Sequence, residues 1–399
     1  MKSLLAAFLA VVTPAMLAAG PIETPVKTAT DPATIASPEK PGAQAIPLDD
    51  LAVVRQSYGG LLTPDGRSLI LQTNLSGRFN LWRVDRGGNF PVQLTRSDNI
   101  QFPEAVARDG SILFLEAPEG LEDFDIFSVP QAGGAAVNLT RTADYVEGRP
   151  RLSPDERRIA FSRRPRQASE YHVAVMDRAT GMVRELTSSR ESGFRWVAVG
   201  WLPDNKTIVV NRTGPGDKPG QILLLDADTG RQTALTPADP RKLWSAVDIA
   251  PDGRSLSVTY ADESGPRRAA IFDIQTRKMR FVPASPWEQS AKHFSPDGRL
   301  LHVETSIDGR VVASVVNVET LEERRVPFPD GAFDTDSRYR SWSADGKLLV
   351  TFSAANAPKD YWLVDPATGE REQLTRQAIA SLDPATLPHS RIVSFPSFD

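Results

Sequence analysis

The chain has 399 residues, which is enough for one large β architecture or for two ordinary domains. Its 46 Lys and Arg and 50 Asp and Glu residues are interspersed, with a net charge of -4 and no basic stripe that could follow a phosphate backbone, so we expect no nucleic-acid partner. The absence of cysteine excludes disulfides, thiol catalysis and zinc sites built on thiolates.

The first residues have the three-part pattern of a secretory signal peptide. Lys2 precedes an apolar run from Leu4 to Val12, and small residues follow it. Cleavage near Ala18 or Ala19 would make residues 1–19 the signal peptide and the mature protein periplasmic or secreted. A retained N-terminal anchor is the alternative, because there is no clean Ala-x-Ala site. No stretch approaches the roughly 18 apolar residues of a membrane span, so none is expected.

Residues 20–46 are rich in Pro, Thr, Ala and Lys and have few large apolar side chains, which predicts a disordered tether. Folded structure is expected from Pro47, with a first strand over Leu51 to Ser57.

From Thr63 onward one turn motif recurs seven times. It reads "TPDGRSLIL", "ARDGSILFL", "SPDERRIAF", "LPDNKTIVV", "APDGRSLSV", "SPDGRLLHV" and "SADGKLLVT". Successive turn aspartates lie 44, 46, 49, 48, 45 and 48 residues apart, at Asp65, Asp109, Asp155, Asp204, Asp252, Asp297 and Asp345. A near-constant period of this size indicates a repeat array. Pro, Asp and Gly in this order favour a tight hairpin, so each turn should join two strands.

Each repeat continues with two more predicted strands. A third strand ends in Asp or Asn, as in "NLWRVD" and "YWLVD", and a fourth ends in Leu-Thr in five copies but not in copies five and six. Four short strands per repeat predict an all-β fold, a seven-bladed β-propeller of the WD-repeat or TolB-like type, over residues 47–381. Its first blade should be complete without a strand from the C-terminus.

The sequence resembles the N-terminal propeller of the prolyl oligopeptidase family of secreted serine peptidases, which includes dipeptidyl- and acylaminoacyl-peptidases. The resemblance covers roughly residues 47–399 and is carried by "GRFNLWRVDRGGNFPVQLT", by "SPDGR" and by the end "EQLTRQAIASLDPATLPHSRIVSFPSFD". TolB-type propellers share the blade pattern. The end is more specific: the resemblance implies that residues 382–399 leave the propeller, with a strand at 390–399, toward an α/β-hydrolase domain beyond Asp399.

The resemblance implies peptide hydrolysis by a Ser-His-Asp triad, with the propeller acting as a size filter for the peptide substrate. The chain contains no G-x-S-x-G pentapeptide, so we expect no catalytic residue in it and no peptidase activity from it alone. No cofactor or metal site is expected, because the histidines lack H-x-x-x-H spacing and the turn aspartates lack D-x-D-x-D-G. Oligomeric state is left open.

Candidate substrate contacts lie on the innermost strand of each blade, which borders the central channel. Trp196, Trp244 and Trp342 precede turns on such strands, and core packing is the alternative for them. His293 lies before the "SPDG" turn, where a purely structural role is the alternative. The acidic stretch "PEGLEDFDIF" and the basic stretch "SRRPRQ" are expected to be solvated.

Two other functions are compatible with the repeats. A stand-alone TolB-like propeller would be a periplasmic protein-binding scaffold without catalysis. A propeller enzyme, such as a glycosidase or lactonase, would need carboxylates or metal ligands that converge in the channel.

Overall fold

The structure is a computed structural model that describes residues 48–88, 90–117, 123–187, 193–214, 220–329, 331–335, 339–377, 382–383 and 386–387. The predicted signal peptide (1–19) and tether (20–46) lie outside the described residues. So do the strand expected at 390–399 and most of the exit segment 382–399.

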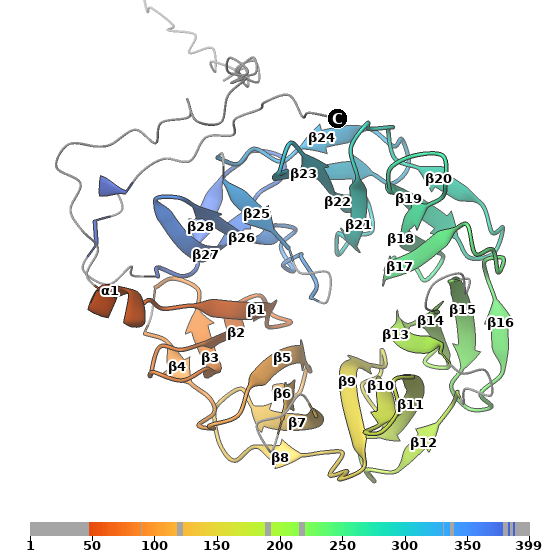
Figure 1. The fold of residues 1–399 in the computed structure, drawn as a ribbon, viewed down its shortest axis with the longest axis horizontal. Helices are drawn as coiled ribbons and strands as arrows, with labels where there is room; N and C mark the ends of the chain where they lie inside the picture. Colours follow the sequence, from red (N-terminus) through yellow and green to blue (C-terminus); the bar gives the residue numbers. More distant parts are fainter. Residues whose placement is uncertain are drawn as a thin grey trace, which may run out of the picture. The chain divides into compact units, whose positions relative to one another are not determined.

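The described residues form seven four-stranded antiparallel sheets, which are the blades of a β-propeller (Figure 1). This confirms the predicted fold class. The first strands border the centre of the ring: β1 (Ser57–Leu62), β5 (Gln101–Val106), β9 (Tyr145–Leu152), β13 (Arg195–Trp201), β17 (Leu243–Ile249), β21 (Gln289–Phe294) and β25 (Ala332–Asp334). The second strands are β2 (Ser68–Thr73), β6 (Ser111–Glu116), β10 (Arg158–Pro165), β14 (Thr207–Thr213), β18 (Ser255–Ala261), β22 (Leu300–Ile307) and β26 (Leu348–Ala354).

The third strands are β3 (Asn80–Asp85), β7 (Asp125–Pro130), β11 (His172–Asp177), β15 (Gln221–Asp226), β19 (Arg268–Asp273), β23 (Arg310–Asn317) and β27 (Ala357–Val364). The short fourth strands are β4 (Val92–Gln93), β8 (Val137–Asn138), β12 (Val183–Glu185), β16 (Gln232–Ala234), β20 (Met279–Phe281), β24 (Glu323–Arg325) and β28 (Arg371–Gln373). Each blade therefore consists of four consecutive strands, and among the described residues no strand is exchanged between the first and last blades.

The recurrent turn is stabilised by its own side chains. In the first copy, Asp65 accepts hydrogen bonds from the Thr63 hydroxyl (2.6 Å) and the Arg67 backbone N–H (3.1 Å). Hydrogen bonds to the ionised carboxylate, from Thr63 first, lower the pKa of Asp65. Gly66 has a φ of 67°, a backbone conformation that favours glycine. The sequence pattern Pro-Asp-Gly is thus explained by turn geometry alone.

The Leu-Thr ending extends the ladder beyond each short fourth strand. The threonine hydroxyl oxygen accepts a hydrogen bond from the backbone N–H of a third-strand residue, as Thr95 does from Leu81 (2.9 Å) and Thr187 from Val173 (2.9 Å). The same bond recurs at Thr140, Thr236 and Thr375. A threonine in this place therefore satisfies a backbone donor that the two- or three-residue strand leaves unpaired.

The start of the fold differs from the sequence prediction. A short helix, α1 (Leu48–Ala52), overlaps the start of the segment expected as a strand at Leu51 and Ala52, and β1 begins only at Ser57. Asp49 and Asp50 lie in the first turn of α1, where they interact favourably with the positive end of the helix dipole. In the described part of the chain, no helix is long and apolar enough to cross a membrane.

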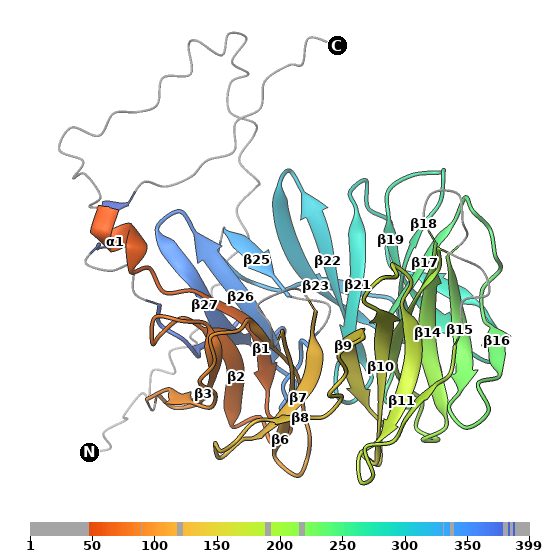
Figure 2. The same ribbon diagram turned by 60° about the horizontal axis from the view of Figure 1, so that its bottom comes forward.

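Apolar clusters join neighbouring blades all round the ring. Seven clusters are present among the described residues, one at each of the seven contacts between adjacent blades. The contact between blades 1 and 7 is built in the same way, from Leu69 and Leu71 of β2 against Leu363 of β27. An ion pair between Arg86 and Glu372 (2.7 Å) also crosses this contact. Packing therefore closes the ring, and Figure 2 shows β1 beside β26 and β27.

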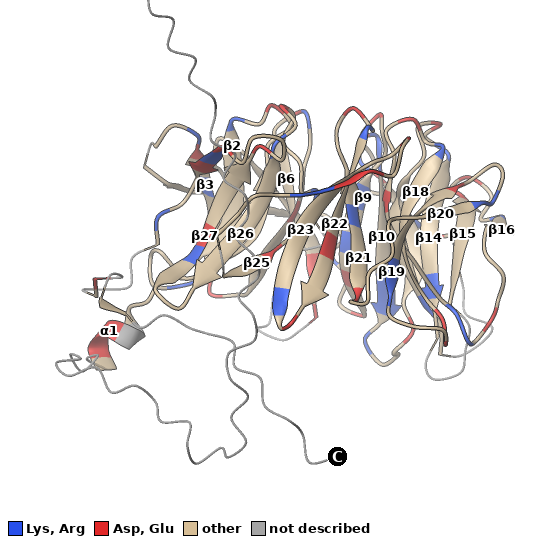
Figure 3. Ribbon diagram, turned by 90° about the horizontal axis from the view of Figure 1, so that it is seen from above, with Lys and Arg blue, Asp and Glu red and all other residues tan. Residues whose placement is uncertain are grey.

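The chain enters and leaves the propeller at the same face of the ring. First strands begin and fourth strands end at one face, which we call the linker face, because alternate strands of each blade are antiparallel. The Gln377 amide, just after β28, donates a hydrogen bond to the Ser57 hydroxyl at the start of β1. The opposite face, which we call the hairpin face, has the recurrent turns. Most charged residues lie near strand ends and turns, but some lie within β9, β21 and β22 (Figure 3).

Candidate functional site

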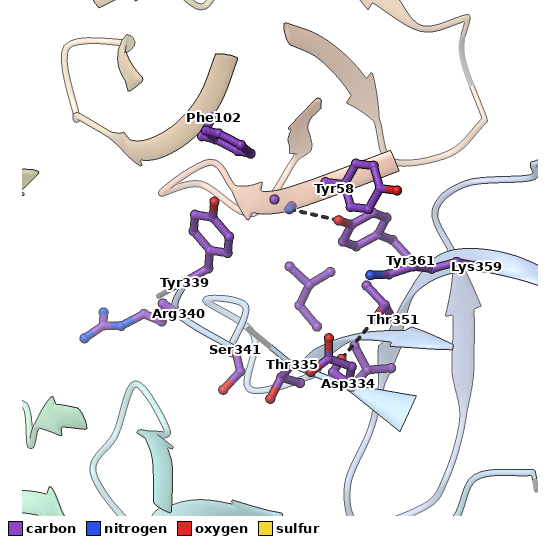
Figure 4. A pocket seen from close by; sticks show the side chains of 14 residues that line it. Tyr58, Phe102, Asp334, Thr335, Tyr339, Arg340, Ser341, Thr351, Lys359 and Tyr361 are labelled. Carbon is purple, nitrogen blue, oxygen red and sulfur yellow. Dashed lines mark hydrogen bonds between the residues drawn. The ribbon is translucent and has the colours of Figure 1, made fainter. Parts of the chain in front are cut away.

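A cavity of about 140 Å³ lies where blade 7 meets blades 1 and 2, toward the linker face (Figure 4). We call it the seam pocket. Tyr58, Gly59 and Gly60 of β1 form one side and Phe102 of β5 contributes an aromatic ring. The other side comes from blade 7: Asp334, Thr335, Tyr339, Arg340, Ser341, Leu349, Val350, Thr351, Lys359 and Tyr361.

Two glycines allow the aromatic rings of blade 7 to approach β1. A Cβ atom on Gly60 would lie 2.3 Å from a ring carbon of Tyr361, and one on Gly59 would lie 2.9 Å from the Tyr339 hydroxyl oxygen. The Tyr361 hydroxyl oxygen accepts a hydrogen bond from the Gly60 backbone N–H (3.1 Å). Gly59 also has a φ of 64°, and β1 has a register shift here. The glycine pair is therefore required for this wall of the pocket.

The charged groups of the pocket lie on one face of the blade 7 sheet. Asp334 of β25 is paired with Thr351 of β26, which is in turn paired with Tyr361 of β27. Lys359 lies two residues before Tyr361, next to a register shift between β26 and β27, and it also lines the cavity. Its ammonium lies 5.6 Å from the centre of the Tyr58 ring, close enough for a cation–π interaction. The carboxylate and the ammonium thus border the cavity with β26 between them.

A buried ion pair supports the pocket from blade 6. Lys292 Nζ lies 2.7 Å from Glu304 Oε2 and donates a hydrogen bond to the Thr335 carbonyl (2.8 Å). The backbone N–H of Thr335 also donates to Glu304 (3.1 Å). Burial raises the pKa of Glu304, and the nearby Lys292 opposes this shift. These contacts fix the backbone next to Asp334.

Two buried histidines share one serine hydroxyl behind the pocket. The Nδ1 atoms of His293 and His302 each lie 3.3 Å from Ser341 Oγ. Burial lowers the pKa of His293 to about 4 and that of His302 well below its usual value, so both imidazoles are neutral at pH 7. The His293 carbonyl accepts a hydrogen bond from the Trp342 indole (2.8 Å). This network holds the first strands of blades 6 and 7 together.

The four substrate-contact candidates predicted from the sequence are all buried. Trp196, Trp244 and Trp342 are 5%, 8% and 3% exposed and belong to the apolar clusters between blades 3 and 4, 4 and 5, and 6 and 7. His293 is 6% exposed. The structure does not bring the three tryptophans together, and substrate contact through these residues stays a prediction.

Two stretches expected to be solvated contain buried charges instead. Asp125 is the first residue of β7 and is buried, while Glu119 and Glu122 lie outside the described residues. In the basic stretch, the Arg163 guanidinium is stacked 3.5 Å from the Tyr145 ring centre and lies 3.7 Å from Glu147. Sequence alone could not show that Arg163 of β10 lies against Glu147 of β9 within blade 3.

This second cluster perturbs a carboxyl group. The pKa of Glu147 is raised to about 7, mainly by burial and also by the neighbouring Asp125, whereas Thr142 and Arg163 oppose the shift. The Thr142 hydroxyl donates a hydrogen bond to Glu147 Oε1 (2.8 Å). Among the described residues, no group of three or more His, Asp or Glu side chains could hold a metal ion.

Sequence reasoning missed the seam pocket. Asp334 and Lys359 are separated from Tyr58 by about 300 positions, and only ring closure brings them together. The one local signal is the Gly-Gly pair inside an otherwise apolar strand, since glycine within a strand often marks a close approach of other groups.

No protein-family model matches the chain. Its fold resembles that of a prolyl endopeptidase, with a TM-score of 0.65, 14% identity, and coverage of 84% of this chain and 51% of that one. An oligogalacturonate lyase solved in complex with manganese gives a TM-score of 0.60 and 16% identity, covering 80% of this chain and 89% of the lyase. TolB from Acinetobacter baumannii gives a TM-score of 0.47 and 20% identity, covering 70% of this chain and 65% of TolB.

The similarity to the prolyl endopeptidase confirms the expected resemblance to prolyl oligopeptidase propellers at the level of the fold. The chain spans about half the length of the prolyl endopeptidase that it matches.

Proposed function

We propose that this chain is the propeller portion of a secreted serine peptidase of the prolyl oligopeptidase type. The observation that carries the proposal is the fold similarity to a prolyl endopeptidase over 84% of this chain but only 51% of that enzyme. The linker face supports it, because a domain that follows blade 7 would be joined to the ring at this face, beside the seam pocket.

In this role the ring restricts which peptides reach a catalytic serine on a domain beyond Asp399. That domain would supply the nucleophile, its histidine base and the oxyanion hole. The chain's own contribution is to exclude large folded substrates and to offer contacts at the linker face. A peptide is the substrate, and the compartment is the periplasm or the medium.

The mass of the native protein tests the proposal. An antibody to the propeller, used for immunoblotting and for mass spectrometry of the captured protein, should detect a species well above the 43.6 kDa of this chain. A native mass just below 43.6 kDa would instead indicate a free propeller and favour the TolB-like scaffold.

A serine-reactive fluorophosphonate probe provides a second, independent readout. The native species should be labelled and should hydrolyse peptides, whereas the purified 399-residue chain should do neither. Probe-sensitive peptidase activity from the purified chain would contradict the absence of a nucleophile in it.

A further inference from the structure

We propose that the seam pocket binds a small zwitterion, a free amino acid or a dipeptide, whose carboxylate is received by Lys359 and whose ammonium is received by Asp334. The site does not depend on the proposed peptidase role, although a dipeptide could be a product of that role.

The two charges lack partners of opposite sign. Elsewhere in the ring, cations at blade contacts are paired, as Arg86 is with Glu372 at 2.7 Å. Within the described ranges, neither Lys359 nor Asp334 has an ion pair, and the side chain of Asp334 has no hydrogen-bond partner. The cavity is bordered by the carboxylate of Asp334 and by two cations, Lys359 and Arg340, and a lining with both signs of charge is complementary to a ligand that has both charges.

The sheet explains why the two groups do not simply pair with each other. Asp334 lies on β25 and Lys359 on β27, with Thr351 of β26 between them. Neighbouring strands are about 4.8 Å apart, so the two backbones are separated by roughly 10 Å. A hydrogen bond spans about 2.8 Å, and an amino acid has one carbon between its two charged groups. Two such bonds and the ligand together fill a gap of this order.

The remaining walls suit an apolar or aromatic side chain. Tyr58 is 42% exposed, and Phe102 borders the cavity from blade 2. Figure 4 shows the rings of Tyr58, Phe102 and Tyr339 around the cavity and Lys359 beside Tyr58. Because aromatic faces bind apolar groups and the cavity is only about 140 Å³, a single hydrophobic residue fits better than an extended peptide.

Calorimetric titration of the purified 399-residue chain tests the proposal, with L-phenylalanine and alanyl-phenylalanine as probes. Each probe is compared with its N-acetyl form, which lacks the ammonium, and with its C-terminal amide, which lacks the carboxylate. We expect the unblocked probe to bind about tenfold more tightly than either blocked form. The tighter of the two unblocked probes identifies the ligand as an amino acid or a dipeptide.

Two variants test which charged group of the ligand each residue binds. Lys359→Gln should remove the preference for the acid over the amide, and Asp334→Asn should remove the preference for the free amine over the N-acetyl form. Lys278→Gln is the matched control, since Lys278 is exposed on the turn between β19 and β20 and does not border the pocket, and the affinity of this variant should change less than twofold. All three replace exposed or half-exposed groups, and circular dichroism checks that each variant folds.

Equal binding of blocked and unblocked probes, or unchanged discrimination in Lys359→Gln and Asp334→Asn, would overturn the proposal. Because the titration uses the propeller alone, its result is independent of the native mass and of probe labelling. If the propeller does not bind the probes, the peptidase proposal is unaffected. If the native protein is a free propeller that still binds the unblocked probes, the pocket proposal is unaffected.

Discussion

Single residues at the contact of blades 1 and 7 determine how closely the two blades approach. Gly60 is the clearest case, because a Cβ atom there would lie 2.3 Å from the Tyr361 ring, while the backbone N–H of the same residue is bonded to the Tyr361 hydroxyl. Any larger side chain at this position must displace the Tyr361 side chain or the strand β1. Even one added methyl group should therefore disturb the packing that joins blades 1 and 7.

We therefore expect Gly60→Ala to reduce the free energy of unfolding by about 1–3 kcal/mol, the usual cost of overpacking. Gly148→Ala is the matched control, since Gly148 also lies in a first strand and a Cβ atom there would meet nothing within 4 Å. Its effect should stay within about 0.5 kcal/mol. Urea unfolding measures both, and equal effects of the two changes would contradict the packing argument.

A second residue-scale effect concerns pH. The pKa of Glu147 is raised from 4.5 to about 7, so the folded state retains a proton that the unfolded chain has lost. Stability from this group is present below pH 4.5 and is lost as the pH rises through about 7. At about 1.4 kcal/mol per pKa unit, the loss amounts to about 3–3.5 kcal/mol.

The variant Glu147→Gln lacks this titration. Its free energy of unfolding, relative to the wild type, should therefore rise by about 3 kcal/mol between pH 4 and pH 8. Urea unfolding at several pH values measures the difference, and Glu263→Gln on an exposed turn controls for the change in net charge. Parallel pH profiles for wild type and Glu147→Gln would show that the carboxyl titrates normally.

At the scale of the element, short fourth strands depend on the residue that follows them. Thr187 comes after the three residues of β12, is buried, and accepts the Val173 N–H at 2.9 Å. Thr187→Val keeps the shape but leaves this donor unsatisfied, which should cost about 1–3 kcal/mol. Thr233→Val on the exposed β16 should change stability by less than about 0.5 kcal/mol. Thermal unfolding of the two variants measures the contrast, and matching losses would contradict the bond's role.

Strands that follow the recurrent turn could be predicted because turn chemistry is local. Asp65 accepts hydrogen bonds from groups that lie within two residues of it. The repeated turn pattern predicted all seven hairpins. The helix at Leu48–Ala52 has no such signal, and its last two residues, Leu51 and Ala52, were expected in a strand. The seam pocket depends on Lys359 meeting Tyr58 across the ring, a contact that no short stretch of sequence encodes.

At the scale of the whole molecule, the fold does not require that blade 1 come first along the chain. Each blade has its own four strands, and Gln377 is bonded to Ser57, so the two ends of the propeller can be joined by a short linker. A circular permutant that starts near Asn99, between blades 1 and 2, and joins residue 377 to residue 56 should fold to the same ring.

Circular dichroism and thermal unfolding measure this outcome. We expect a β-rich spectrum and a Tm within about 5 °C of that of the original order, which corresponds to less than about 3–4 kcal/mol for a propeller of this size. A permutant that fails to fold would show that the covalent order of blade 1 before blade 2 stabilises the ring, contrary to closure by packing alone.

The self-contained blades also have a consequence for synthesis on the ribosome. A sheet made of four consecutive strands can pair as soon as those strands have emerged, so each blade contributes contacts that are local in sequence. The contact between blades 1 and 7 is the exception, because Leu69 must wait for Leu363. Until that last blade is made, the apolar face of blade 1 remains uncovered, and it is the surface of the nascent chain most in need of a chaperone.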